Sequence, residues 1–281
     1  MTPPTLAPFL KPDGLEMLHP GAALREASVL TEAGRYVLHR AERSLRVRSP
    51  YAGAAPNRAV QPVVLVPGFL AGDASLAVMA HALRVDGIRT YRSHIHANIG
   101  CTLTAANQLE ARVESIVARR GTTVRIVGHS LGGMLARTVA ARRPDLVSGI
   151  VTLGSPMLGP GAHHPSISAA VEVLVRLSRA GMRGLMAEDC IAGECARQAF
   201  EACRAPLDEG VEFTAIYSPR DGVVDHRACI DPQARAVEVR ASHIGMAIDP
   251  RVIARVREAL SLDWAGSAHG SLAEVDSGEI A

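Results

Sequence analysis

The stretch VRIVGHSLGGMLAR, residues 124–137, places a single serine between glycines where an apolar run gives way to a helical pattern. Gly128 stands two residues before Ser130, and Gly132 stands two residues after it. An ordinary loop needs no such glycines, but a very tight strand-to-helix turn does, because neighbouring Cβ atoms would collide with it. The pattern predicts that Ser130 is a nucleophile, with a helix N-terminus behind it that favours developing negative charge.

A serine hydroxyl is a weak nucleophile, so it needs a general base, and the base needs an acid to orient it. His243 follows the apolar run ARAVEV and is the predicted base, on the loop after the last strand. Asp221 lies in the Pro- and Gly-containing turn after another predicted strand. We favour Asp221 as the acid over Asp225, because it lies nearer the strand end. The chain order Ser130, Asp221, His243 is the order that accompanies this serine motif.

Charge that develops on an attacked oxygen must be stabilised by two backbone N–H groups. Leu131 directly follows the serine and is one predicted donor. Phe69 is the other, because it follows the apolar run in VVLVPGFL, where Gly68 lets the backbone approach closely. The apolar neighbours of these loops predict a substrate pocket, and besides Phe69 they are Leu70, Met157, Leu158 and Ile244.

Two histidine pairs have spacing that a metal ion could use, His94 with His96 and His163 with His164. No carboxylate of the sequence converges on either pair, so we interpret these residues as exposed histidines. We expect no metal ion and no cofactor in the predicted chemistry.

The elements that must position these residues follow an alternating pattern from residue 60 onward. Strands alternating with helices indicate the α/β class, with a mostly parallel sheet of about six strands covered on both faces. The predicted strands are the apolar runs at 62–66, 123–127, 148–153, 211–217 and 235–239. The predicted helices lie near 75–85, 104–120, 131–142 and 250–260.

A long insertion, residues 157–208, interrupts this alternation between two strands. It carries helical patterns at 167–180 and 194–203. Because an insertion at the carboxyl edge of a parallel sheet lies over the ligand crevice, we interpret it as a helical cap. The whole predicted domain spans residues 59–265, and residues 266–281 are predicted to be a flexible tail.

Residues 1–58 are predicted to be an N-terminal extension that ends in a linker at 49–58. Residues 21–47 carry apolar side chains at helical spacing, with arginines on the other face. This pattern predicts an amphipathic helix, interrupted near Gly34. We expect its apolar face, which includes Leu24, Leu30 and Leu38, to pack on the main domain. Contact with a membrane surface is the alternative.

Composition excludes several other classes of protein. The 281 residues carry a net charge of only +2 without a dominant basic run, which argues against a nucleic-acid partner. No apolar stretch is long enough to span a bilayer. The N-terminus MTPPTLAPFLKPDG lacks the pattern of a secretory signal, so a cytoplasmic location is the default expectation.

The five cysteines leave two interpretations open. Cys190, Cys195, Cys203 and Cys229 fall within 40 residues of one another, and Cys101 stands apart. The C-x4-C spacing is a poor zinc motif by itself. One or two disulfides joining the segment around residue 190 to the loop around Cys229 would favour a secreted or periplasmic protein. The alternative is a set of small buried thiols.

The region from about residue 60 to 262 resembles the α/β-hydrolase superfamily, close to its bacterial lipase and carboxylesterase branches. The motifs that carry the resemblance are PGFLAGDAS, NIGCT, GHSLGG, TLGSP, YSPRDGVVD and SHIGM. It implies serine-dependent hydrolysis of an ester, with Ser130, Asp221 and His243 as the catalytic triad. Phe69 and Leu131 would form the oxyanion hole. Pro67 stands where many relatives carry histidine, which does not affect a main-chain donor.

The substrate does not follow from the fold. The insertion and the apolar loop residues favour an aliphatic acyl chain. The aromatic content of 3% argues against an aromatic cleft for a bulky polymer. We therefore expect hydrolysis of short-to-medium acyl esters of a small molecule or lipid. An acyltransferase or thioesterase with the same triad is the alternative, and a non-catalytic binding module is a third interpretation.

Overall fold

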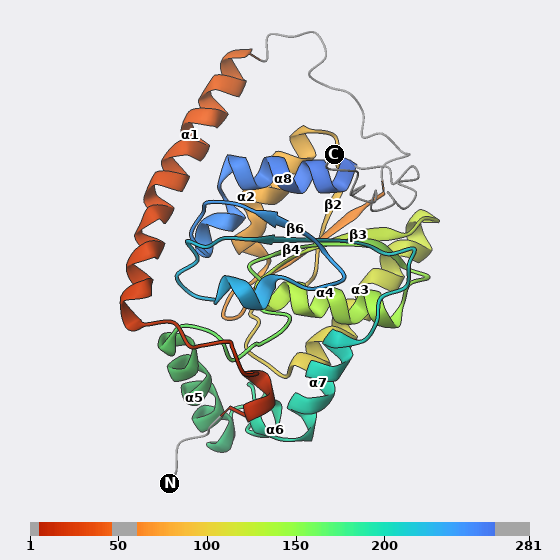
Figure 1. Ribbon diagram of the computed structural model, residues 1–281. Helices are drawn as coiled ribbons and strands as arrows, with labels where there is room; N and C mark the ends of the chain where they lie inside the picture. Colours follow the sequence, from red (N-terminus) through yellow and green to blue (C-terminus); the bar gives the residue numbers. More distant parts are fainter. Residues whose placement is uncertain (1–5, 47–60, 262–281) are drawn as a thin grey trace, which may run out of the picture.

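The computed structural model describes residues 6–46 and 61–261 and shows a six-stranded sheet between helices (Figure 1). The strands lie in the order β2-β1-β3-β4-β5-β6, and each neighbouring pair is parallel. The predicted α/β class with a parallel sheet of about six strands is confirmed. The strands are β1 (Val63–Val66), β2 (Thr90–Arg92), β3 (Val124–His129), β4 (Val147–Leu153), β5 (Glu212–Tyr217) and β6 (Arg235–Glu238).

Five of these strands coincide with the predicted apolar runs, and β2 does not. It is an edge strand of three residues, in which Tyr91 is half-buried and Arg92 is exposed. A strand so short and so little buried leaves no apolar run in the sequence.

Helices cover both faces of the sheet, with α3 and α4 on one face and α2 and α8 on the other (Figure 1). None of the described helices is both long and apolar enough to cross a bilayer. The α-helices are α1 (Val29–Arg46), α2 (Ala77–Val85), α3 (Thr102–Arg120), α4 (Leu131–Arg142), α5 (Pro165–Arg179), α6 (Asp189–Ala192), α7 (Glu194–Arg204) and α8 (Pro250–Ser261). The 3-10 helices are η1 (Pro8–Leu10), η2 (Pro20–Ser28), η3 (Asp73–Leu76), η4 (His226–Cys229) and η5 (Ile244–Ala247).

Strand β1 shows why its sequence has no polar alternation. Val64 and Val66 pack in the core beneath α3 and α4. Val63 and Leu65 point to the opposite face, against α2 and α8. Because successive side chains of a strand point to opposite faces, a strand covered on both sides needs apolar residues at every position.

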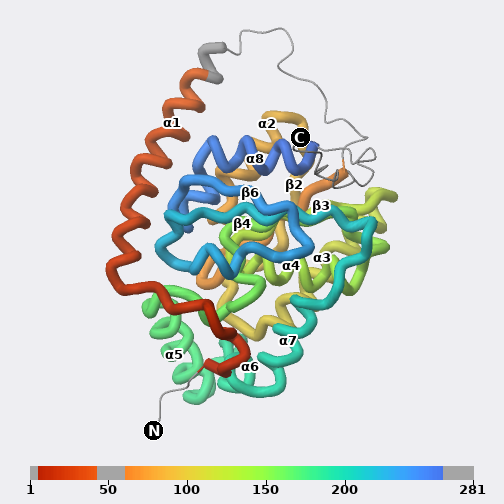
Figure 2. Tube along the Cα trace, in the orientation of Figure 1, coloured from red at the N-terminus to blue at the C-terminus, as the bar shows by residue number. Residues whose placement is uncertain are grey.

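The insertion between β4 and β5 forms α5, α6 and α7, which lie together at the end of the molecule where the described chain begins (Figure 2). The core holds the end of α7 through Arg137 of α4, which is 2% exposed. The guanidinium forms an ion pair of 2.8 Å with Asp231 and donates to the carbonyl oxygens of Cys203 and Ala205. A buried arginine with these partners joins the insertion, helix α4 and the loop before β6.

The N-terminal helix differs from expectation in two respects. The chain forms η2 and then α1, which continues through Gly34 without interruption. The expected apolar contact face is also wrong, because Leu24, Leu30 and Leu38 are 80%, 77% and 66% exposed. Among residues 29–42 of α1, whose side chains the structure describes, the buried one is Glu32, at 1% exposure. This face of the helix meets loops rich in backbone N–H groups, which a carboxylate satisfies and a leucine does not.

The cysteines do not pair as one interpretation expected. All five are free thiols, and Cys190 and Cys195 lie beside Cys101 rather than beside Cys229. Cys203 and Cys229 fit the alternative of small buried thiols, at 1% exposure each. The linker at 49–58 and the tail at 266–281 lie outside the described residues.

Helix α4 approaches the sheet so closely that its first turn has no room for side chains. A Cβ atom at Gly132 would overlap the carbonyl oxygen of Val66 in β1. A Cβ at Gly128 would overlap the backbone of Gly132, and one at Gly133 would overlap the hydroxyl of Ser155. The glycines around Ser130 are therefore a packing requirement between α4 and the strands.

We predict that Gly132→Ala destabilises the protein by about 1–3 kcal/mol or more, because the new methyl group forces α4 away from β1. Urea unfolding followed by circular dichroism measures the change. Gly34→Ala is the matched control, because a Cβ there meets no atom within 4 Å in an exposed part of α1. It should leave stability unchanged or raise it by about 0.5–1 kcal/mol. Equal stability of Gly132→Ala and the wild type would contradict the packing argument.

Candidate active site

Ser130 occupies the turn between β3 and α4, as the glycine pattern predicted. It is the N-cap residue of α4, with φ 52° and ψ −124°. A positive φ is strained for a residue with a Cβ, and here the surrounding backbone enforces it. The N–H of Ser130 donates to the carbonyl oxygen of Leu153 in β4 at 2.8 Å. The half-buried serine side chain is thus held at the carboxyl end of the sheet, at the border of a cavity.

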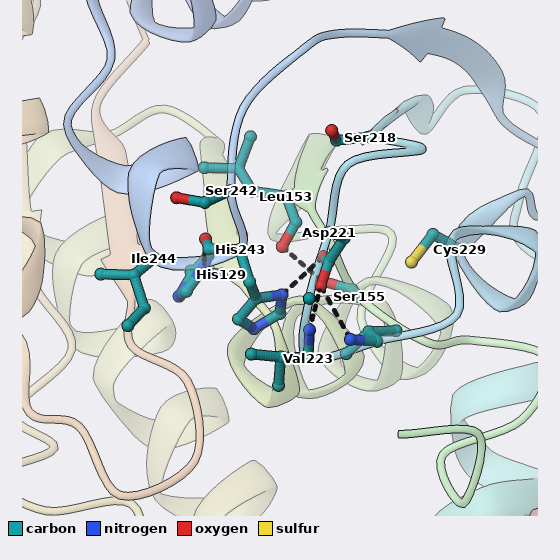
Figure 3. A network of polar contacts seen from close by, with 12 residues as sticks. His129, Leu153, Ser155, Ser218, Asp221, Val223, Cys229, Ser242, His243 and Ile244 are labelled. Atoms are coloured by element: carbon teal, nitrogen blue, oxygen red, sulfur yellow. Dashed lines mark hydrogen bonds and ion pairs between the residues drawn. The ribbon is translucent and has the colours of Figure 1, made fainter. Parts of the chain in front are cut away.

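Asp221 and His243 come together from the loops after β5 and β6 (Figure 3). Their carboxylate oxygen Oδ2 and ring nitrogen Nδ1 are 2.7 Å apart. The other oxygen of Asp221 accepts from the N–H groups of Val223 and Val224 at 2.8 and 2.7 Å. Both side chains are nearly inaccessible, at 2% and 5% exposure. With Nδ1 engaged, the Nε2 atom of His243 is the ring nitrogen left for proton transfer.

Asp225, the other acid considered, has a different set of partners. Its carboxylate caps η4 by accepting from the N–H of Arg227 at 3.0 Å, and it binds the guanidinium of the same residue at 2.6 Å. Burial would raise the pKa of Asp225, but the hydrogen bonds and charge of Arg227 lower it. The structure thus pairs His243 with Asp221 and leaves Asp225 to an arginine.

The two histidines beside this site have opposite electrostatic surroundings. Burial alone lowers the pKa of His243, but the charge and hydrogen bond of Asp221, with the charge of Glu26, raise it above 6.5. Burial and the neighbouring His243 lower the pKa of His129 to about 4. The neutral His129 ring donates its Nε2–H to the carbonyl oxygen of His243 at 2.9 Å. His243 can therefore accept a proton, whereas the neutral His129 holds the backbone of His243 in place.

The two proposed N–H donors lie on turns beside the serine. A Cβ at Gly68 would be only 3.0 Å from the Cβ of Ser130, so the turn bearing Phe69 packs directly against it. Within the described residues, the N–H groups of Phe69 and Leu131 have no hydrogen-bond acceptor. Buried Asn98 holds the Phe69 turn. Its side-chain amide donates to the carbonyl oxygen of Pro67 at 3.0 Å, and its main-chain carbonyl oxygen accepts from the N–H of Leu70 at 3.0 Å.

A cavity of about 490 Å³ opens in front of these groups. Ser130, His243, Phe69 and Leu131 all border it, as do the predicted pocket residues Leu70 and Ile244. The insertion and the N-terminal segment supply an apolar part of the wall, which consists of Leu6, Leu10, Ile167, Val171, Met186, Ile191 and Phe200.

Two predicted pocket residues and one predicted surface histidine are placed elsewhere. Met157 is completely buried in the core against Cys203, and Leu158 is held by its N–H bond to the carbonyl oxygen of Ala228. Neither borders the cavity, because the chain turns into the core after β4. His163 is 6% exposed and borders the cavity, whereas we expected it on the surface. Its neighbour His164 caps α5 by accepting from the N–H of Ser166.

The sequence did not indicate the contribution of Glu26. One of its carboxylate oxygens accepts from the backbone N–H of Gly222 at 2.8 Å and from the backbone N–H of His243 at 2.9 Å. The other oxygen accepts from the backbone N–H of Ile244 at 3.0 Å. A single carboxylate therefore joins the Asp221 loop to the His243 loop. In the sequence, Glu26 is one acidic residue in an amphipathic segment, and no local motif marks it.

Glu32 supports the same loop from the next turns of the N-terminal segment. Its carboxylate accepts from the N–H of Ser242 at 2.8 Å and from the hydroxyl of Ser242 at 2.6 Å. Arg35 then binds Asp249 at 2.7 Å, just beyond η5. The residue preceding His243 is thus fixed from outside the sheet.

Comparisons with known proteins agree with this architecture. Residues 101–190 match the family model described as alpha/beta hydrolase fold. A triacylglycerol lipase of Vibrio cholerae is 34% identical over 131 residues, which cover 42% of this chain and 41% of that protein. A triacylglycerol lipase of Burkholderia plantarii is 33% identical over 123 residues, covering 40% of this chain and 34% of that protein. The chain thus aligns with about two fifths or less of the length of these relatives.

Similarity of structure extends further along the chain than similarity of sequence. The mature form of a Bacillus licheniformis lipase superposes with a TM-score of 0.59 at 14% identity, covering 74% of this chain and 95% of that one. At such low identity the superposition concerns the fold alone. Together with the parallel sheet and the β3–α4 turn, it shows that the chain has the α/β-hydrolase fold, with lipases among the proteins it is similar to.

Proposed function

We propose that the protein is a serine carboxylic-ester hydrolase that acts on short-to-medium acyl esters. The observation that carries the proposal is the 2.7 Å hydrogen bond between His243 and Asp221, with His243 and Ser130 bordering the same apolar cavity. A nucleophile, a base and an orienting acid in this chain order constitute the machinery of acyl transfer. The lipase names of the sequence relatives support the same reaction class.

In the proposed mechanism the Ser130 hydroxyl attacks the acyl carbonyl while Nε2 of His243 accepts its proton. Asp221 stabilises the imidazolium that forms. The N–H groups of Phe69 and Leu131 donate to the oxyanion of the tetrahedral intermediate. His243 then returns the proton to the departing alcohol, which leaves an acyl group on Ser130. Water then attacks the acyl group with His243 again as the base, and the carboxylic acid leaves Ser130.

The cavity supports an aliphatic acyl group as the ligand. Its volume of about 490 Å³ lies within the range of small-molecule sites. Isoleucine, valine, methionine and phenylalanine side chains of the insertion form much of its wall, which suits a hydrocarbon chain better than a charged group. The wall is closed partly by Leu6 and Leu10 of the N-terminal segment, so the space for a chain is limited.

We predict that Ser130→Ala abolishes turnover of p-nitrophenyl butyrate without lowering the midpoint of thermal unfolding. Asp221→Asn should lower kcat by about four orders of magnitude, which is the effect of the corresponding change in serine proteases. Asp225→Asn should retain most of the activity, because Asp225 binds Arg227 instead. Steady-state kinetics on purified variants checks all three. Wild-type activity of Ser130→Ala would refute the mechanism, and a larger loss in Asp225→Asn would reassign the acid.

Chain-length preference should follow the cavity. Each added methylene contributes about 0.8 kcal/mol on burial, so kcat/KM should rise about fourfold per carbon until the chain meets the wall. Val171→Phe fills part of the cavity from α5 and should move the optimum to shorter esters. Val173→Phe on the same helix is the matched control, since Val173 is 53% exposed. A p-nitrophenyl ester series that peaks only at long chains would contradict the short-to-medium preference.

The pH profile should reflect the raised pKa of His243. A general base must be neutral, so kcat/KM falls as the pH drops through the pKa of His243, and the midpoint should lie above 6.5. Glu26→Gln removes a negative charge that favours the imidazolium, so it should move the midpoint to lower pH. The control is Glu42→Gln, an exposed residue of α1. Reduced activity with an unshifted midpoint would mean that Glu26 only holds the loops.

A further inference from the structure

Three cysteine side chains converge where the insertion meets the core. The Sγ atom of Cys195 lies 3.4 Å from that of Cys101 and 3.7 Å from that of Cys190. All three sulfur atoms lie within 4.8 Å of one another. Cys101 precedes α3, whereas Cys190 belongs to α6 and Cys195 to α7, so the cluster joins segments about 90 residues apart.

We propose that Cys101, Cys190 and Cys195 form a binding site for a thiophilic metal ion of the zinc class. Zinc–thiolate bonds are about 2.3 Å long, which places neighbouring sulfurs of a tetrahedral site about 3.8 Å apart. The two short separations in the cluster are within a few tenths of an ångström of that value. A disulfide would use two of the sulfurs at about 2.05 Å and leave the third without a role.

The cluster lies at the start of two helices and is open to solvent. Cys101 is the N-cap residue of the 19-residue helix α3, and Cys195 is the second residue of the 11-residue helix α7. Two helices therefore begin at the cluster, and the thiols lose their protons when a metal ion binds to them. All three residues are partly exposed, which gives an ion access from solvent. Three protein ligands leave one position of a tetrahedral ion for water.

The site would fasten the insertion to the core beside the cavity. The N–H of Met186 already donates to the carbonyl oxygen of Ile99 at 2.8 Å, two residues before Cys101. A Cβ at Gly100 would come within 2.8 Å of the carbonyl oxygen of Gly184, so the two backbones are in close contact. Cys190 also borders the cavity. A bound ion would thus hold α6 and α7 over the space in front of Ser130, whatever reaction occurs there.

The experiment is a zinc titration of the full-length chain, reduced and handled without oxygen. We expect one Zn²⁺ per chain, measured against a competing chromophoric chelator. Bound zinc should protect three of the five thiols from alkylation, and peptide mass spectrometry should identify these as Cys101, Cys190 and Cys195. Cobalt in place of zinc should give thiolate charge-transfer absorption in the near ultraviolet. None of these three readouts depends on catalytic activity or on a folded variant.

Matched variants locate the site. Cys190→Ser and Cys195→Ser should lose stoichiometric binding. Cys203→Ala and Cys229→Ala remove buried thiols outside the cluster and should retain stoichiometric zinc binding. Less than one zinc per reduced chain would overturn the proposal. Protection of other cysteines from alkylation would also overturn it, as would an equal loss of zinc binding in the control variants. A Cys101–Cys195 disulfide that re-forms after reduction in the presence of zinc would do the same.

Discussion

The close contact between helix α4 and strand β1 determines the geometry of the candidate site. Because the backbones nearly touch at Gly132, the chain must turn within one residue after β3, and Ser130 takes a positive φ to do so. That conformation directs the serine side chain out of the sheet and into the cavity. It also leaves the N–H of Leu131 at the positive end of a 12-residue helix, where negative charge is favoured.

The other half of the site depends on carboxylates rather than on apolar packing. The loops after β5 and β6 contain N–H groups that no strand can pair, and leaving such groups unpaired in the interior costs about 1–3 kcal/mol each. Glu26 accepts from three of them, and Glu32 accepts from the N–H and the hydroxyl of Ser242. The N-terminal segment therefore fixes His243 and also contributes charge to its environment. This explains why Glu32 of α1 points inward while Leu30 and Leu38 point outward.

The sequence was sufficient where the physical cause is local. Strands buried on both faces leave unbroken apolar runs, and the steric demands of one turn leave glycines around Ser130, so both were predictable. The pairing of Asp221 with His243 followed from the ends of parallel strands lying along one edge of a sheet. Asp225 has the same residue type and nearly the same position. Only the structure shows that Arg227 occupies its carboxylate.

Contacts between distant segments left no comparable signal. Glu26 and Glu32 lie about 200 residues from the loops they support, and in the sequence they belong to the polar side of an amphipathic pattern. Cys101 lies too far from the C-x4-C pair for spacing to connect them. Met157 was expected in the pocket because it follows β4, yet the chain turns inward there and buries it. In each case tertiary packing, rather than local pattern, decides which groups meet.

The most direct test of Ser130 as the nucleophile is to trap its acyl intermediate. The protein would be mixed with excess p-nitrophenyl butyrate, quenched in acid, digested and examined by mass spectrometry. A butyryl group on the peptide that contains Ser130, absent from Ser130→Ala, is the predicted result. A butyryl group on another residue, such as a cysteine of the Cys101 cluster, with none on Ser130, would contradict it.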